Sequence, residues 1–163
     1  MKLILCFGIF SAFVFIGRWI YHAFRARKQY FESLVRFCDN LVTEIGFSKK
    51  TVAQIIQTYI DGYSLQFAQD LLSYAGLLRR HEDLTHENLV LWTGLKTAER
   101  HIVTNFFLEL GKHSVTEELE KIKKARGRFE AFRAESAEKL KRDASIYLKI
   151  CILLGIGVVI LIL

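Results

Sequence analysis

Histidines and glutamates are the residues of this sequence best suited to catalytic chemistry, but their spacing does not form a known motif. His81 and His86 enclose acidic residues as in a zinc protease, yet they are five apart rather than four. Zinc ligands on one helix face need the four-residue spacing. A membrane enzyme could still assemble its site from the distant His101, His113 and Glu109. Because histidines more often pack or face water, the sequence predicts no catalytic residue, metal or cofactor.

Other catalytic motifs are incomplete or missing. The segment from Gly94 to Thr97 holds a lysine and a hydroxyl, but it lacks the Gly-Lys pair, the upstream glycine and the preceding strand of a phosphate loop. No Gly-x-Ser-x-Gly elbow occurs. Cys6, Cys38 and Cys151 suit small buried apolar positions better than a disulfide or metal site. These observations favour a non-enzymatic protein.

A run of charged residues after Ser114 is the best candidate for recognition. Its glutamates and lysines stand three or four apart, which places them in pairs along a helix face. Such a face is usually only solvated, and the more specific hypothesis is a surface that docks a partner protein. The candidate docking residues are Lys112, Glu117, Glu118, Lys121 and Lys124. The net charge of +6 could suit RNA, but no aromatic-interleaved basic motif accompanies it, so no nucleic acid is predicted.

Two apolar segments are expected to carry this charged helix at a membrane. Residues 3–24 are long enough to cross a bilayer if Arg18 reaches the interface. A cleaved signal peptide is the rival interpretation, but no small-x-small site follows the apolar core. The run 150–163 is shorter, and it spans only if residues 144–148 contribute. The predicted domains are a span over 1–24, a cytoplasmic part over 25–145 and a span over 146–163.

Basic residues next to both apolar segments set the expected orientation. They lie on the side of the middle segment, whereas only Lys2 lies on the other side. The positive-inside rule therefore predicts two spans, both termini outside and a cytoplasmic middle domain. The flanking basic residues are Arg25, Arg27, Lys28, Lys139, Lys141 and Arg142.

The middle segment has the pattern of consecutive helices. Apolar residues recur at three- and four-residue steps, no strand-like alternation of useful length occurs, and the chain has no proline. Ser114 and Glu117 form a capping-box pattern that opens a long final helix running into the last apolar segment. The fold class is therefore all-α, an antiparallel bundle of about five or six helices flanked by N- and C-terminal transmembrane helices. The earlier helices are expected over 31–45, 52–59, 65–78 and 85–110, the last with a break allowed at 94–97.

The order of these features resembles the family of stage III sporulation protein AB. The resemblance is clearest over 107–114 (FLELGKHS), 117–119 (EEL) and 147–163 (YLKICILLGIGVVILIL). It implies a cytoplasmic bundle similar to the platform proteins of type II secretion and type IV pilus machines. It also implies residence in the mother-cell membrane around the forespore, in a multiprotein complex beside a secretion-type ATPase (stage III sporulation protein AA-like).

Two non-enzymatic functions are compatible with these features. The leading hypothesis is a membrane platform that docks the ATPase on its cytoplasmic helices. The alternative is a structural spacer that forms a homo-oligomer through Gly8 and Ala12, or through Gly155, because small residues allow close contact between membrane helices.

Overall fold

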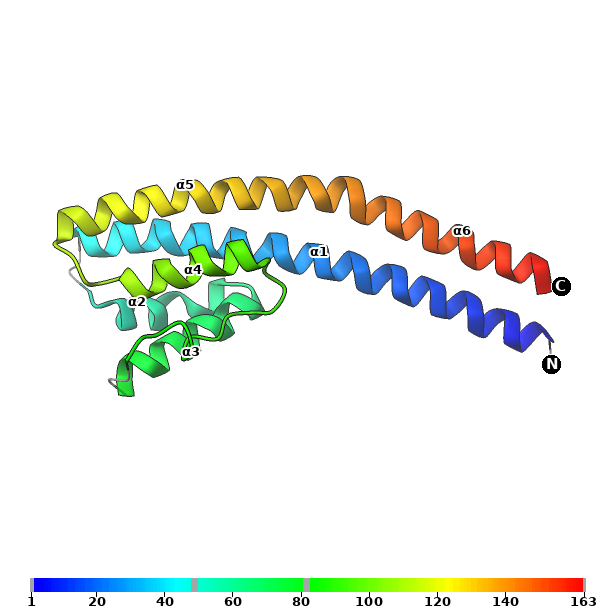
Figure 1. Cartoon of the computed structure of the whole chain (residues 1–163), viewed down its shortest axis with the longest axis horizontal. Helices are drawn as coiled ribbons and strands as arrows, with labels where there is room; N and C mark the ends of the chain where they lie inside the picture. The colour runs from blue at the N-terminus through cyan, green and yellow to red at the C-terminus, as the bar shows by residue number, and fades with distance from the viewer. Residues whose placement is uncertain (1, 48–49, 81–82, 163) are drawn as a thin grey trace. The chain divides into compact units, whose positions relative to one another are not determined.

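The computed structural model describes residues 2–47, 50–80 and 83–162, and these ranges contain helices joined by loops and no strand. The all-α fold predicted from the sequence is confirmed (Figure 1). The helices are α1 (Lys2–Phe47), α2 (Val52–Tyr59), α3 (Leu65–Arg80), α4 (Thr97–Glu109), α5 (Val115–Lys139) and α6 (Ser145–Ile162). A 3-10 turn (Ile60–Gly62) follows α2, and a π-helical segment (Leu140–Ala144) joins α5 to α6. Ser48, whose hydroxyl could also start α2, lies outside the described residues, and Thr51 caps this helix.

The chain divides into two compact units, and the helices α1 and α5 contribute to both. The central unit is 29–133, and the terminal unit combines 1–28 with 134–163. The central unit holds the helical bundle. The terminal unit holds the two apolar segments that the sequence predicts to be membrane spans.

An aromatic and aliphatic core fills the central unit. The stripe predicted on the second half of α1 is buried, with Phe31, Leu34 and Cys38 at 0 % exposure. The rings of Phe37 and Phe107 pack with their centroids 6.2 Å apart. Burial raises the pKa of the Cys38 thiol to about 12, in keeping with its predicted role as a small core residue.

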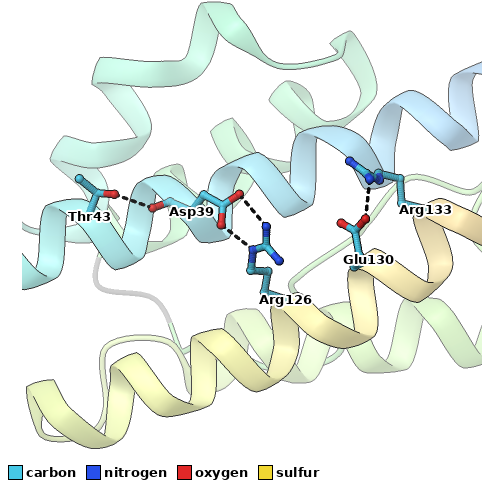
Figure 2. Close-up of polar contacts among 5 residues, drawn as sticks. All are labelled: Asp39, Thr43, Arg126, Glu130 and Arg133. Carbon is cyan, nitrogen blue, oxygen red and sulfur yellow. Dashed lines mark hydrogen bonds and ion pairs between the residues drawn. The ribbon is translucent and has the colours of Figure 1, made fainter.

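A bidentate ion pair links α1 and α5 at the surface of the central unit. Arg126 donates from Nε to Asp39 Oδ1 at 2.5 Å and from Nη2 to Oδ2 at 3.3 Å (Figure 2). Thr43 donates to the Asp39 carbonyl, and Arg133 pairs with Glu130 one turn further along α5. Since both partners of the Asp39 pair are exposed, we expect it to contribute at most about 1 kcal/mol.

The segment 83–96 is an ordered loop, so the prediction of a helix starting at Thr85 is wrong. Thr85 caps only a single turn, accepting from the Asn88 amide at 3.3 Å. Leu89 and Leu91 are buried while Val90 between them is 73 % exposed, which is the alternation of an extended chain. Helix α4 begins at Thr97, at the end of the break allowed by the sequence, so only the part predicted before the break is not a helix.

A buried carboxylate explains why this loop does not continue as a helix. The amide of Trp92 donates to Asp70 Oδ2 of α3 at 3.1 Å, whereas in a helix it would donate to the carbonyl four residues earlier. Tyr30 donates its hydroxyl to the same oxygen at 2.7 Å, and its ring stacks on Trp92. Burial raises the pKa of Asp70, and the hydrogen bonds from Trp92 and Tyr30 partly offset that rise.

Close helix contact organises the terminal unit. A side chain at Gly155 would lie 3.1 Å from the Phe10 ring, and one at Gly17 would lie 3.2 Å from Cys151 Cβ. Gly155 therefore packs against α1 within the chain, at the position where the spacer hypothesis expects a contact with a second copy. Gly8 and Ala12 are exposed on α1. Both terminal helices are long and apolar enough to cross a membrane, and little of either apolar stretch is buried within the protein.

Candidate partner-docking site

The turn between α4 and α5 is fixed by a glycine and a buried glutamate. Gly111 has φ +84°, a left-handed conformation that favours glycine at the end of a helix. Its amide donates to Glu118 Oε1 at 2.9 Å, and the Lys112 amide donates to the Glu109 carbonyl at 3.3 Å. Glu118 is only 5 % exposed. The sequence assigned Glu118 to an exposed docking surface, and the structure places it inside, where it holds the turn.

The first turn of α5 is capped by Ser114 and Glu117, in a different way from the predicted box. Glu117 Oε2 accepts from the Ser114 amide at 3.4 Å, as predicted. The Ser114 hydroxyl donates to the same carboxylate at 2.9 Å, instead of accepting from the helix backbone. These hydrogen bonds lower the pKa of Glu117. Because Glu117 is occupied by this cap, its first role is to start the helix.

A groove runs along the hairpin formed by α4 and α5, with a volume of about 300 Å³. Its floor is apolar and partly exposed, and one of its edges is basic. The lining residues of α4 span 102–109, with Leu110 just past its end, and those of α5 span 118–129, so the groove follows about 10 and 16 Å of helix. The apolar lining residues are Ile102, Phe106, Leu110, Ile122, Ala125 and Phe129.

Three cations of α5 form the basic edge of this groove: Lys121, Lys124 and Arg128. Lys121 is engaged, since its Nζ lies 3.4 Å from Glu109 Oε2 and 2.6 Å from His113 Nε2. Lys124 and Arg128 are exposed, and no carboxylate among the described residues pairs with either. The groove therefore presents apolar surface beside two uncompensated positive charges.

The structure brings together part of the predicted docking set and adds to it. Lys121 and Lys124 line the groove, whereas Lys112 and Glu117 are exposed beyond its end. Sequence reasoning missed Arg128, although it follows Lys124 by four residues and so continues the same stripe. It also missed Phe106, because nothing in the sequence shows which side of an aromatic-rich helix stays uncovered.

One end of the groove holds a buried polar atom without a partner. The second oxygen of Glu118, Oε2, is buried and accepts no hydrogen bond. The hydroxyl of Tyr74, a fully buried residue, also has no hydrogen-bond partner. The pKa of Tyr74 is raised, mainly by burial and secondarily by the charge of Glu118. Unsatisfied buried groups are uncommon in folded proteins and need a specific explanation.

The residues of the enzyme hypothesis are distributed over different contacts. Glu109 and His113 both contact Lys121, whereas His101 stacks on His86 and contacts Asn105. His101 lies eight residues before Glu109 on α4, about 12 Å along the helix. No group of three metal-ligating side chains occurs within the described parts of the chain, and His81 lies outside them.

The six flanking basic residues gather in the terminal unit. Arg25, Lys141 and Arg142 are exposed, and Arg27, Lys28 and Lys139 are half-buried. Lys139 pairs with Glu135 at 2.7 Å and Arg142 with Asp143 at 2.9 Å.

Fold and site together define a helical bundle with two long apolar terminal helices and a groove that has an apolar floor and a basic edge. A family model, stage III sporulation protein AB, matches residues 2–163. The chain belongs to that family, which gives it a role in sporulation. No curated protein and no solved structure matches the chain.

Proposed function

We propose that the chain is a non-enzymatic membrane platform that docks a cytoplasmic secretion-type ATPase during sporulation. The observation that carries this proposal is the groove between α4 and α5, with its apolar floor and basic edge. Family membership and the two apolar terminal helices support a membrane-bound role in a sporulation complex. The complex would lie between mother cell and forespore, with 25–145 in the mother-cell cytoplasm.

The groove suits an amphipathic helix of the partner. Its length of about 10 to 16 Å accommodates two to three helical turns, about the footprint of a helix whose apolar residues recur every three or four positions. Apolar side chains of that helix would cover Phe106 and Ala125. Acidic side chains on its flank would face Lys124 and Arg128, which have no carboxylate partner within the described chain.

Charge reversal at the edge of the groove tests this proposal. The full-length chain in detergent micelles is immobilised, and binding of the cognate ATPase is measured at low salt. Lys124→Glu combined with Arg128→Glu should weaken binding by about tenfold, because edge charges contribute on the order of 0.5–1 kcal/mol each. Added salt should weaken the wild-type complex too, since it screens exposed charges.

A neighbouring lysine supplies the control. Lys123 is exposed on α5 but does not line the groove. Lys123→Glu should leave binding nearly unchanged. If the folded wild-type chain binds no ATPase at low salt, the platform proposal fails. If Lys123→Glu and Lys124→Glu weaken binding equally, docking occurs elsewhere on the helix.

Reporter fusions test the proposed orientation separately. Fusions at residues 1 and 163 should both report the side opposite the cytoplasm. A cytoplasmic C-terminus would contradict the two-span arrangement and remove the membrane geometry on which the platform proposal depends.

A further inference from the structure

A second cleft lies within the terminal unit, where α1 passes the π-helical segment. Its volume is about 370 Å³. Tyr21 and Lys28 line it from α1, and Lys141 and Ser145 line it from the other side. The polar groups that these residues offer are two ammonium ions and two hydroxyls, and none of the lining residues is acidic. Such a set of donors suits a phosphate, which accepts hydrogen bonds and carries negative charge.

The charges around the cleft single out Lys141. Its basic neighbours Lys139 and Arg142 are each paired with a carboxylate of the same helix. Lys141 is exposed, and no carboxylate of the described chain pairs with it. The cleft therefore contains a cation that the protein itself leaves uncompensated.

Lys141 lies in the π-helical segment. Leu140–Ala144 interrupts the regular α-helical repeat between α5 and α6. A π-turn holds more residues than an α-turn, so it changes which side chains face a neighbouring helix, and such turns occur frequently at functional sites. Leu140 and Lys141 line the cleft from within this segment.

Exposed apolar side chains continue along both helices on the side of the cleft that leads to the chain ends. Ile16 and Trp19 precede Tyr21 on α1 and are 47 and 68 % exposed. Ile150 and Leu153 follow Ser145 on α6 and are 46 and 68 % exposed. A ligand with an anionic head and hydrocarbon chains would match both surfaces, with its chains along the apolar helices.

We infer that this cleft binds the phosphate of an anionic phospholipid, held by Lys28 and Lys141 with Tyr21 and Ser145 as hydroxyl donors. Basic pockets between membrane helices on the cytoplasmic side bind such head groups through the same chemistry. The site does not depend on the docking function proposed above. It would fix the depth of the terminal unit at the membrane surface.

Lipid retention by the full-length chain tests the inference. The protein is reconstituted with equal amounts of phosphatidylglycerol and phosphatidylcholine, extracted into mild detergent, and analysed by native mass spectrometry. We expect one phosphatidylglycerol to be retained in preference to phosphatidylcholine. Lys141→Gln should reduce that retention about fivefold, the usual contribution of one lysine near an anionic lipid.

Lys139→Gln is the matched control. It removes the same charge two residues before Lys141, from a lysine that is already paired with Glu135. It should leave retention within about twofold of wild type, and circular dichroism should show equal helicity in both variants. Equal loss in the two variants would indicate a diffuse positive field and overturn the site. Equal retention of both lipids would do the same.

A further measurement separates a lipid head group from a soluble phosphate. Inorganic phosphate added at about 10 mM should not displace the retained phosphatidylglycerol, because the hydrocarbon chains of the lipid add to the binding of the lipid. Displacement of the lipid by inorganic phosphate would assign the cleft to a soluble anion and contradict the inference.

Discussion

Replacing Tyr30 with phenylalanine removes one hydroxyl from the core of the central unit and should destabilise the protein. The Tyr30 hydroxyl donates to Asp70 Oδ2 at 2.7 Å, and the same oxygen holds the Trp92 amide of the loop 83–96. Loss of this donor leaves a buried carboxylate with one partner fewer. The substitution removes the hydroxyl while keeping the ring that packs in the core.

The magnitude follows from the type of bond. A hydrogen bond to a charged group contributes about 1.5–3 kcal/mol, so we expect Tyr30→Phe to cost about 2 kcal/mol at neutral pH. For a chain of this size that corresponds to a fall of about 4–8 °C in Tm. At acidic pH, where Asp70 is protonated, the bond is between neutral groups and the cost should decrease to about 1 kcal/mol.

Tyr74 supplies an internal control for this prediction. It is also fully buried, but its hydroxyl has no hydrogen-bond partner. Tyr74→Phe should therefore be neutral or stabilise the protein by up to about 1 kcal/mol, because it removes an unsatisfied buried group. The two variants make the same chemical change at equal burial, so the difference between their stabilities reports the hydrogen bond to Asp70.

Thermal and urea unfolding of the full-length protein in detergent, followed by circular dichroism, provides the measurement. The reasoning is refuted if Tyr74→Phe costs as much as Tyr30→Phe. That result would mean that the Tyr74 hydroxyl bonds to Glu118 in solution. An unchanged stability for Tyr30→Phe would show that the Tyr30 hydroxyl adds no hydrogen bond to Asp70 in solution.

Three further substitutions test other parts of the structure. Gly111→Ala should cost about 1–2 kcal/mol, because its φ is left-handed, whereas Gly127→Ala in the interior of α5 should stabilise by about 0.5–1 kcal/mol; thermal unfolding of both variants checks the opposite signs. Asp70→Asn should flatten the pH dependence of stability. Because the pKa of Asp70 is raised in the folded state, its contribution to stability is full below the unfolded pKa of about 3.9 and is lost as pH rises through the folded pKa. The free energy of unfolding of the wild type should therefore fall across this window relative to that of the variant, as measured by urea unfolding at several pH values. Arg126→Gln should lower the free energy of unfolding by at most about 1 kcal/mol, because the pair with Asp39 is exposed. In about 1 M salt the difference from wild type should nearly vanish. A larger or salt-independent loss of stability would show that the pair is shielded from solvent.

Signals that lie within a few residues of one another were predictable from the sequence. The apolar stripe of α1 is buried as expected. Thr51 caps α2: its side chain accepts from the Gln54 amide, and the Gln54 side chain accepts from the Thr51 amide. The Ser114 start of α5 is also where the pattern placed it. These features depend on helical period and on side chains three or four positions apart, which the sequence displays directly.

Features set by contacts distant in the sequence were missed. The loop 83–96 departs from the predicted helix because Trp92 donates to Asp70, 22 residues earlier in the chain. Glu117 and Glu118 are adjacent residues of the same type, so the sequence does not distinguish them. In the structure Glu118 turns inward and accepts from the Gly111 amide, whereas Glu117 caps α5. Phe106 and Lys124 line the same groove only because α4 and α5 form a hairpin, and the sequence does not show that pairing.

Photo-crosslinking from two adjacent positions of α5 tests the docking proposal most directly. A photoreactive amino acid replaces Lys124, which lines the groove, or Lys123, which does not. In the membrane-reconstituted full-length chain mixed with the cognate ATPase, position 124 should form a crosslinked product and position 123 should form little. Equal products at the two positions, or none at 124 while the proteins co-purify, would contradict docking in the groove.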